Sequence, residues 1–292
     1  MQLAQPSILA GPPPAGRFLT LGLVPDAPAR AALERVAALR AGEGLVVGLG
    51  DPLLRGAGLH LDELRPFPAL SGPGGAFPSA QGAVWLFLAG RDPGEILHRT
   101  RKVVAELGEH FRIDEDVASF VYAEGRDLSG YEDGTENPKG ARAVEVALCS
   151  GKPGLAGGSF VAAQRWVHDL ARIEKLAPQE RDYIVGRDRE SNQELDDAPP
   201  SAHVKRSAQE SFEPAAFMLR RSMPWGDVRE HGLYFVAYAA SLDPYERVLR
   251  RMIGLDDGIA DGLLRFTRPV SGGYYWCPPL AGERLDLRAL GI

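Results

Sequence analysis

The residues best suited to chemistry lie between positions 130 and 138, which read Gly-Tyr-Glu-Asp-Gly-Thr-Glu-Asn-Pro. Gly130 and Gly134 permit positive φ angles and the Asn-Pro pair favours a turn, so this stretch predicts a shaped loop. Asp133 lies between the two glycines, where a carboxylate held in place could accept and return a proton. Because an isolated Asp-Gly pair is usually part of an acidic surface turn, a catalytic interpretation needs partners elsewhere in the chain.

His203 is the histidine best placed to be such a partner. It follows Pro199-Pro200 in a long irregular stretch, and we expect it to lie in a fixed loop rather than on a helix. Its imidazole could bind a metal or a haem iron, although spacing alone favours an ordinary structural role. Solvated or structural roles are expected for the other five histidines: His60, His98, His110, His168 and His231.

Two adjacent arginines, Arg220 and Arg221, end a short apolar segment. Successive side chains of a strand point to opposite faces, so one of the two would face each side. Either arginine could enter a polar pocket, and both could equally be solvated.

Composition excludes several classes of function. With 292 residues, 45% of them hydrophobic, the chain can form one large domain or two of ordinary size. Its formal net charge of -6, without a basic cluster, gives no reason to expect nucleic acid or anionic membranes as partners. Residues 1–6 do not resemble a secretory signal, and no apolar run is long enough to span a membrane. Two distant cysteines, Cys149 and Cys277, without a CxxCH motif, indicate a reduced, cytoplasmic protein rather than a disulfide scaffold.

The first half of the chain predicts the elements that must position these residues. Residues up to 16 are rich in Pro, Gly and Ala and suit a flexible arm. Strands are expected at 17–24, 45–49, 83–89 and 117–122, and helices at 27–40 and 92–107. Asp92 is expected to cap the second helix, with Pro93 at its first position. The long crossing at 51–81 should carry short elements. This order is that of a ferredoxin-like unit.

The second half predicts a similar series. Strands are expected at 158–168, 217–220, 233–239 and 266–276, and helices at 179–185 and from Asp243-Pro244, as the cap, to 252. A strand followed by an Asp-Pro helix start occurs once in each half, which favours a duplication. We therefore expect an α+β fold with two subdomains, residues 1–128 and residues 129–292.

Taken together, these motifs resemble those of the dye-decolorizing peroxidases. Residues 130–138 are similar to the family's GxxDG-x-x-NP signature, and further similarities follow in order at 184–187, 194–197, 201–206, 220–226, 231–235 and 264–275. The resemblance implies two ferredoxin-like halves of the dimeric α+β barrel type, with antiparallel sheets and flanking helices. It also implies haem b in the second half. The chain's compact length resembles the bacterial, cytosolic-type branch.

The resemblance also implies roles for single residues. His203 matches the proximal iron ligand, Asp133 the distal acid and Arg220 the distal arginine. Ser222 lies where the family places a small polar distal residue. The carboxylate partner of His203 would be Asp257 or Asp261, of which Asp261 is favoured. Further cofactor contacts are expected from Glu132, Gly134, Thr135 and Arg187.

These residue types suit peroxide chemistry. A neutral imidazole is a strong axial donor to iron, and a carboxylate on its other nitrogen raises its donor strength. Asp133 would carry a proton between the two peroxide oxygens, and Arg220 would stabilise charge on the leaving oxygen. Arg220 is also expected to lower the pKa of Asp133. Because aspartate is intrinsically more acidic than histidine, a site based on Asp133 is expected to work best in acid.

The implied function is a haem b peroxidase that reduces hydrogen peroxide through a ferryl intermediate and oxidises small organic donors such as dyes and phenolics. A haem carrier or iron-recovery protein, and a barrel that binds no haem, are the alternatives. We expect a homo-oligomer, and little room after the last strand for a C-terminal tail that would direct packaging in an encapsulin shell. Electron relays to the surface could involve the tyrosines or the tryptophans, Trp85, Trp166, Trp225 and Trp276.

Overall fold

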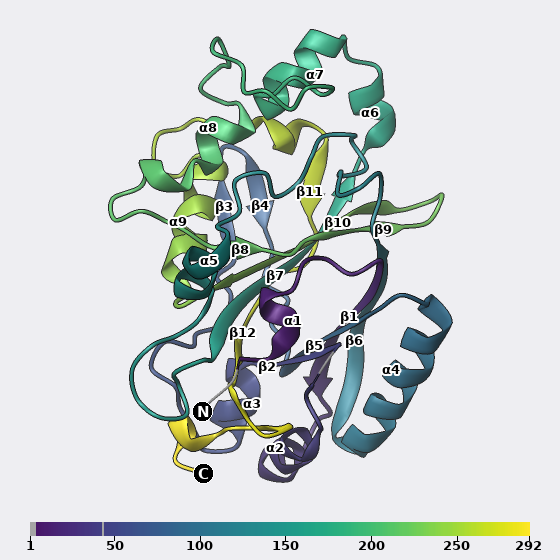
Figure 1. The fold of residues 1–292 in the computed structure, drawn as a ribbon, viewed down its shortest axis with the longest axis vertical. Coiled ribbons are helices and arrows are strands. Elements are labelled where there is room, and N and C mark those ends of the chain that lie inside the picture. Colours follow the sequence, from purple (N-terminus) through teal and green to yellow (C-terminus); the bar gives the residue numbers. More distant parts are fainter. Residues whose placement is uncertain (1–3, 43) are drawn as a thin grey trace.

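Strands from both halves of the chain close into one barrel in the computed structural model, which describes residues 4–42 and 44–292 (Figure 1). The order around the barrel is β7 (Ser159–His168), β12 (Gly273–Cys277), β2 (Leu45–Leu49), β5 (Val84–Gly90), β1 (Ala15–Leu23), β6 (Phe111–Phe120), β9 (Met223–Gly226) and β10 (His231–Ala239). The barrel closes because β10 also pairs with β7. Two short strands, β11 (Thr267–Pro269) and β8 (Leu219–Arg220), pair with β7 and β10.

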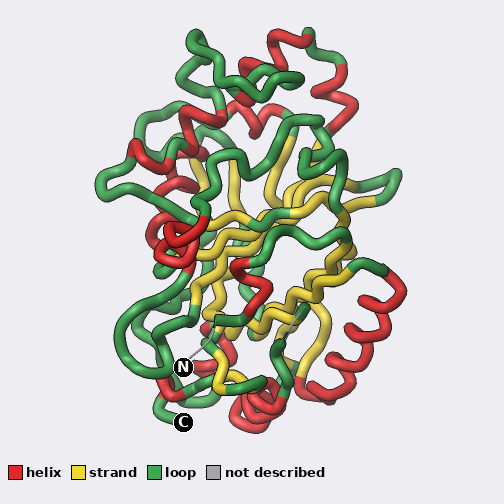
Figure 2. The backbone as a smooth tube through the Cα atoms, in the orientation of Figure 1, coloured by secondary structure: helices red, strands yellow, loops and turns green. Residues whose placement is uncertain are grey.

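The N-terminal half has the predicted ferredoxin-like order. Its strands lie side by side as β2-β5-β1-β6, all antiparallel, and α2 (Ala29–Ala38) and α4 (Pro93–Leu107) connect them. The crossing between β2 and β5 carries α3 (Asp51–Gly56), β3 (Leu70–Gly72) and β4 (Gly75–Phe77), as expected from its length. The helices lie outside the barrel in Figure 2.

The C-terminal half repeats this order as β12-β7-β10 followed by β9 and β8. Its second connection is α9 (Asp243–Met252). Its first connection is expanded into α6 (Leu170–Glu174), α7 (Pro178–Val185) and α8 (His203–Ser207), which form the upper part of Figure 1. The predicted α+β class is therefore confirmed. The predicted boundary between the two subdomains, at residues 128 and 129, lies in the connection from β6 to β7, which also contains α5 (Gly140–Ala147). This boundary remains a proposal.

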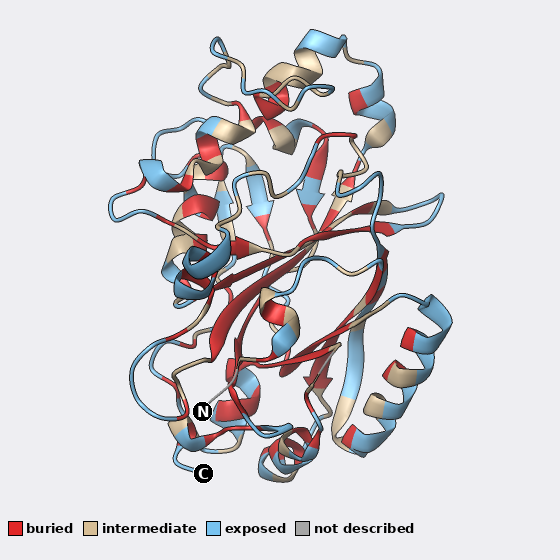
Figure 3. Ribbon diagram, viewed as in Figure 1, coloured by how far each residue is buried: buried red, intermediate tan, exposed pale blue. Residues whose placement is uncertain are grey.

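Aromatic side chains from both halves fill the barrel. The ring centroids of Phe18 and Tyr234 lie 4.1 Å apart and nearly parallel, and Trp85 donates a hydrogen bond to the hydroxyl of Tyr234 at 3.2 Å. Most barrel strands are accordingly buried along most of their length, whereas β6 and the outer face of α4 are largely exposed (Figure 3). Burial of this aromatic surface joins the two halves through one core. No helix in the described residues is both long and apolar enough to cross a membrane.

The N-terminal segment differs from its prediction as a flexible arm. Residues 1–3 lie outside the described residues, but α1 (Pro6–Leu9) packs against the barrel core through the fully buried Ile8. Gln5 is also fully buried, and its amide donates to the carbonyl oxygens of Val47 and Pro278 at 2.9 Å each. The prediction was wrong because composition alone did not show that these two side chains find partners.

Two predicted strands also have different bounds. The segment predicted as one strand at 266–276 contains β11 and β12, which pair one after the other with the same edge of β7 and are interrupted at residues 270–272, while β10 pairs with the other edge. The strand predicted at 117–122 begins earlier, at Phe111, because β6 continues along the full length of β1.

The two Asp-Pro helix starts proved unequal. Asp92 is the N-cap of α4, and its carboxylate accepts a hydrogen bond from the backbone N–H of Glu95 at 2.8 Å, as predicted. In the second copy the N-cap is Leu242, and Asp243 instead contacts Arg65 at 2.7 Å. The predicted cap by Asp243 is therefore wrong, since the helix begins at Asp243 itself.

We expect Asp92→Ala to lower the free energy of unfolding by about 1 kcal/mol, because it removes the side-chain acceptor that caps the start of α4. Asp243→Ala should cost less, since its surface ion pair contributes only about 0–1 kcal/mol. Urea denaturation of both variants measures the difference. Equal stability of Asp92→Ala and the unchanged protein would show that the cap hydrogen bond contributes nothing.

Candidate functional site

A large cavity lies in the C-terminal half, between one face of the sheet and helices α8 and α9. It contains about 1000 Å³ of empty space, including its opening to solvent. Most of its wall is apolar, formed by Trp166, Val185, Met218, Leu233, Phe235, Val248, Leu249, Met252, Leu263 and Phe266. Such a cavity, with a few polar groups at defined places, suits a large and mainly apolar ligand.

His203 presents one nitrogen to this cavity. Its Nδ1 lies 2.8 Å from the Oδ2 atom of Asp261, whose side chain is completely buried and also accepts a bond from the Leu263 N–H at 2.9 Å. Because an ionised carboxylate can only accept, Nδ1 must carry the proton. The hydroxyl of Ser207 donates to the His203 carbonyl oxygen at 2.8 Å. Nε2 of His203 lies 3.5 Å from the Ser207 hydroxyl and is the ring nitrogen left to bind a ligand in the cavity.

The surroundings of His203 decide two points that the sequence left open. Of the two candidate partners, Asp261 contacts the imidazole, whereas Asp257 forms an ion pair with Arg206 at 2.7 Å. His203 is also the first residue of α8 and does not lie in a loop, so that prediction is wrong. The short helix follows the turn that begins at Pro199, whose carbonyl oxygen accepts a bond from the Ala202 N–H.

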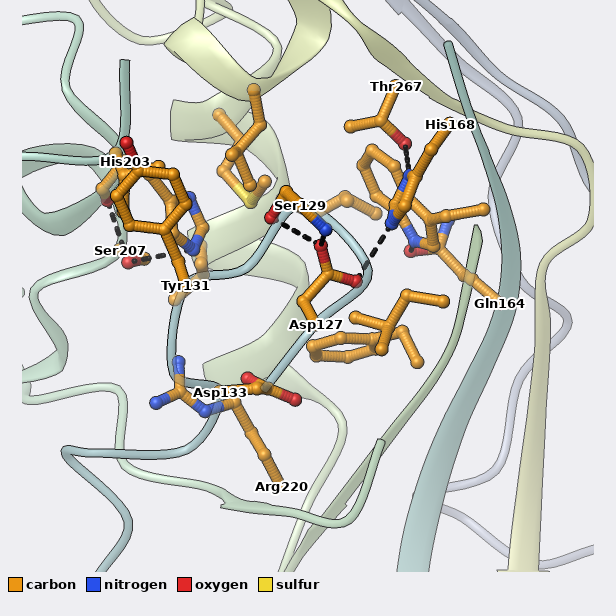
Figure 4. Close-up of a pocket in the computed structure, with 18 of the residues that line it drawn as sticks. Asp127, Ser129, Tyr131, Asp133, Gln164, His168, His203, Ser207, Arg220 and Thr267 are labelled. Atoms are coloured by element: carbon orange, nitrogen blue, oxygen red, sulfur yellow. Dashed lines mark hydrogen bonds and ion pairs between the residues drawn. The ribbon is translucent and has the colours of Figure 1, made fainter. Parts of the chain in front are cut away.

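Asp133 and Arg220 lie together at another part of the cavity wall, across from His203 in Figure 4. The loop that carries Asp133 has positive φ at Gly130 (92°) and Gly134 (78°), which explains the two glycines. Asn137 then joins this loop to β8. Its side chain accepts from the Arg220 N–H at 2.8 Å and donates to the Arg220 carbonyl oxygen at 3.1 Å. Asn137 therefore sets the position of Asp133 relative to Arg220.

The two adjacent arginines separate as alternating strand residues should. Arg221 points away from the cavity and donates to the carbonyl oxygen of Leu9 at 3.1 Å. Arg220 lines the cavity, and its buried Nε has no hydrogen-bond partner among the described residues. A guanidinium N–H without a partner on a cavity wall is available to an anionic or electron-rich ligand.

Burial raises the pKa of Asp133 above its usual range, although the positive charge of Arg220 opposes this effect. The neighbouring Asp127 raises the pKa further, and His203 lowers it. The predicted influence of Arg220 is therefore present, but the net direction is opposite to the prediction because removal from water dominates. As the pH falls, Asp133 therefore becomes protonated at a higher pH than a free aspartate does.

A second polar network on the cavity wall was not predicted. Asp127 accepts hydrogen bonds from the N–H and hydroxyl of Ser129 and contacts Nε2 of His168 at 3.0 Å. The other ring nitrogen of His168 lies 2.7 Å from the hydroxyl of Thr267. Burial would raise the pKa of Asp127, but His168 and Ser129 outweigh it and lower the pKa. Both ring nitrogens of His168 therefore have partners, and the structural role expected for it stays a prediction. The position of Asp127 in the same loop as Asp133 was the available sequence signal for this network.

Several predicted residues lie away from the cavity wall. Arg187 pairs with Glu136 at 2.8 Å, and the hydroxyl of Thr135 accepts from Asn192 at 3.0 Å. Ser222 is buried, and its hydroxyl accepts from the Val236 N–H at 3.4 Å. Of the other predicted residues, Glu132 lines the cavity and also accepts a hydrogen bond from Asn192, Gly134 shapes the loop, and Trp166 is the predicted tryptophan that lines the cavity.

The fold and the cavity define a protein of two fused ferredoxin-like halves whose second half holds a ligand-sized site headed by a histidine. The family described as "Dyp-type peroxidase, C-terminal" matches residues 124–282, which include every polar residue of this site. The chain belongs to the dye-decolorizing peroxidase family.

Individual relatives agree with this assignment over nearly the whole chain. The dye-decolorizing peroxidase of Mycobacterium tuberculosis is 30% identical, with 94% of this chain and 88% of the relative covered. That of Brevibacterium linens is 31% identical, covering 94% and 80%. Among solved structures, a dye-decolorizing protein from V. cholerae has a TM-score of 0.84 at 29% identity, covering 95% and 97%. A DypB variant from Rhodococcus jostii RHA1 in complex with heme has a TM-score of 0.85 at 29% identity, covering 95% and 97%.

Proposed function

We propose that this protein is a haem b peroxidase that uses hydrogen peroxide to oxidise small organic electron donors. One observation carries the proposal. The cavity combines a histidine nitrogen oriented by a buried carboxylate with a second charged pair, Asp133 and Arg220, and the Nε of Arg220 has no hydrogen-bond partner among the described residues.

The residues present fit haem. His203 offers a single neutral nitrogen, Asp261 holds its ring and increases its basicity, and the apolar wall suits a porphyrin. The related DypB structure in complex with heme supports the same assignment. When bound, haem supplies the centre through which electrons pass from the donor to peroxide. We further propose that haem would be contacted by Glu132, Gly134, Thr135 and Arg187. Ser222 would act on the side of the haem that binds peroxide.

Asp133 would move the proton that peroxide reduction requires. Two electrons and two protons convert one hydrogen peroxide into two water molecules. One peroxide oxygen must first lose a proton, and the other must gain one before it leaves as water. Asp133 in its carboxylate form can accept the first proton and return it to the leaving oxygen. Arg220 stabilises the negative charge that develops there, and needs no rearrangement because its guanidinium already faces the cavity.

An absorption spectrum of the purified protein tests the proposal directly. We expect a Soret band, a rapid spectral change on addition of peroxide, and a return to the starting spectrum when an organic donor follows. A protein that only carries haem needs His203 but not Asp133 or Arg220, so its spectrum would respond slowly to peroxide. A protein that shows no Soret band after incubation with haem would contradict the proposal.

Arg220→Leu should change both the rate and its pH dependence. Removal of the cation that lowers the pKa of Asp133 raises this pKa further. Because Asp133 must be unprotonated to act, the acid limb of the pH–rate profile should move to higher pH. Above that limb, loss of charge stabilisation should slow the peroxide step by about 10²–10³-fold. Stopped-flow measurements across pH check both effects.

Arg221→Leu is the matched control, since it removes a cation from the next residue but not from the cavity. Its acid limb should lie where that of the unchanged protein lies. An Arg220→Leu profile with an unmoved acid limb would contradict the coupling between Arg220 and Asp133.

A cytoplasmic location, a homo-oligomeric state and the absence of nucleic-acid or membrane partners are part of the same proposal. The absence of nucleic-acid and membrane partners is argued from the net charge of -6, and the cytoplasmic location from the two distant cysteines, Cys149 and Cys277.

A further inference from the structure

A second hollow lies next to the haem-sized cavity. It is beside α6, where β7 ends and where β10 and β11 begin. It is rich in arginine, and we call it the arginine groove, defined by Arg172, Arg229, His231, Arg265 and Arg268. These residues come from α6, the turn between β9 and β10, and the segment leading into β11, in the upper half of Figure 1.

The groove and the main cavity share part of their walls. His168, Phe266 and Thr267 line both. A molecule in the groove would therefore be separated from the contents of the cavity by a single layer of side chains.

The positive charge of the groove is largely uncompensated. Arg172, Arg229 and Arg268 are exposed, and within the described residues their guanidinium groups form no ion pair or hydrogen bond. Only Arg265 is paired, to Glu180 at 2.6 Å. The one carboxylate in the lining, Asp169, accepts the Arg172 N–H at 3.0 Å as the N-cap of α6. In a chain of net charge -6, this local excess of cations attracts anions to one place.

The remaining lining is apolar, which restricts the kind of anion. Leu170, Leu264 and Phe266 contribute hydrocarbon surface between the arginines. Guanidinium groups bind carboxylate and sulfonate oxygens through paired N–H donors and also stack on aromatic rings. A ring with an anionic substituent satisfies both parts of the surface, whereas a simple inorganic anion would leave the apolar part uncovered.

We propose that the arginine groove binds aromatic carboxylates and sulfonates and positions them as electron donors to the cavity. This inference rests on the proposed peroxidase function. Each donor molecule gives up one electron, so two donors and two protons reduce one hydrogen peroxide to two waters. The donor need not enter the cavity, because the shared wall of His168, Phe266 and Thr267 is all that separates the two sites.

The test compares two double variants with the same change in charge. Arg229→Ala with Arg268→Ala removes two cations of the groove. Arg30→Ala with Arg101→Ala removes two exposed arginines from α2 and α4, in the other half of the molecule. The probes are 2-naphthalenesulfonate and the uncharged 2-naphthol, and binding is measured by calorimetry without peroxide.

We expect the groove variant to bind 2-naphthalenesulfonate about tenfold more weakly or worse, since each charged hydrogen bond lost is worth about that factor. Binding of 2-naphthol should stay the same, and the distant variant should bind both probes like the unchanged protein. In turnover, the groove variant should show a raised KM for 6-hydroxy-2-naphthalenesulfonate, with unchanged KM for 2-naphthol.

Three results would overturn the inference: sulfonate binding that survives in the groove variant, an equal loss in the distant variant, or weakened binding with an unchanged KM for the anionic donor. Because the calorimetry uses no peroxide, it gives an answer even if the protein is not a peroxidase. A normal spectral response to peroxide in the groove variant shows that the proposed function is intact while the groove is impaired.

Discussion

Replacing Asp133 by asparagine is expected to slow the reaction with hydrogen peroxide by about 10²–10⁴-fold while haem binding is retained. Asparagine has nearly the same size as aspartate but cannot accept a proton at any working pH. Asp133 lines the cavity beside Arg220, and neither residue is needed for the contact between His203 and Asp261. The loss should therefore appear in the peroxide step and not in the amount of haem bound.

Stopped-flow absorption with limiting peroxide measures this step directly. In the unchanged protein the rate should rise with pH through the pKa of Asp133, which burial places above its ordinary range. In Asp133→Asn that dependence should disappear together with most of the rate. Glu136→Gln is the matched control from the same loop, because Glu136 lies outside the cavity wall and pairs with Arg187. If Asp133→Asn reacted as fast as this control, the proton would have to move through another group.

Replacing His203 by alanine is expected to abolish stable haem binding. The imidazole is the nitrogen donor that faces the cavity, and Asp261 holds it there through a bond of 2.8 Å. Without it, a porphyrin would lose its bond to the iron and be held only by contacts with the cavity wall. The Soret band of the purified variant should be lost, and added imidazole should partly restore it, because the cavity left by the side chain can admit the free base.

Asp261→Asn leaves the His203 ring in place but weakens the contact that orients it, so it tests the contribution of Asp261 alone. An amide can still contact Nδ1 but carries no charge, so haem affinity should fall by about 10–100-fold, the usual cost of losing a partner of a ligating histidine. Titration of the haem-free protein with haem measures both affinities. His98→Ala, on the exposed side of α4, should bind haem normally. A persistent Soret band of full intensity in His203→Ala would assign the iron ligand to a different residue.

The order of elements could be predicted from the sequence because it follows from local patterns. Buried strands such as β5 and β10 are short apolar runs, and α4 begins with an Asp-Pro start whose cap the structure confirms. The loop at 130–138 was likewise predictable, because glycines with positive φ and an Asn-Pro pair leave few other conformations.

Closure of the barrel could not be predicted from such local sequence patterns. The sheets of the two halves meet through single paired positions, Leu49 in β2 with Trp276 in β12 and Ser119 in β6 with Trp225 in β9. These pairings join segments that are far apart in the chain, and local periodicity contains no information about them. The buried position of Gln5 depends on the same closure, since its partners lie in β2 and after β12.

The sequence by itself therefore determined the α+β class, the repeated strand order and the identity of His203, Asp133 and Arg220 as residues worth testing. Only the tertiary structure decided how they act. Asn137 bonds both backbone groups of Arg220, and burial reverses the expected direction of the pKa of Asp133. The same holds for the arginine groove, whose cations come from three separate segments. Hydrogen-bond geometry, desolvation and the field of neighbouring charges depend on distances across the fold, which spacing along the chain does not specify.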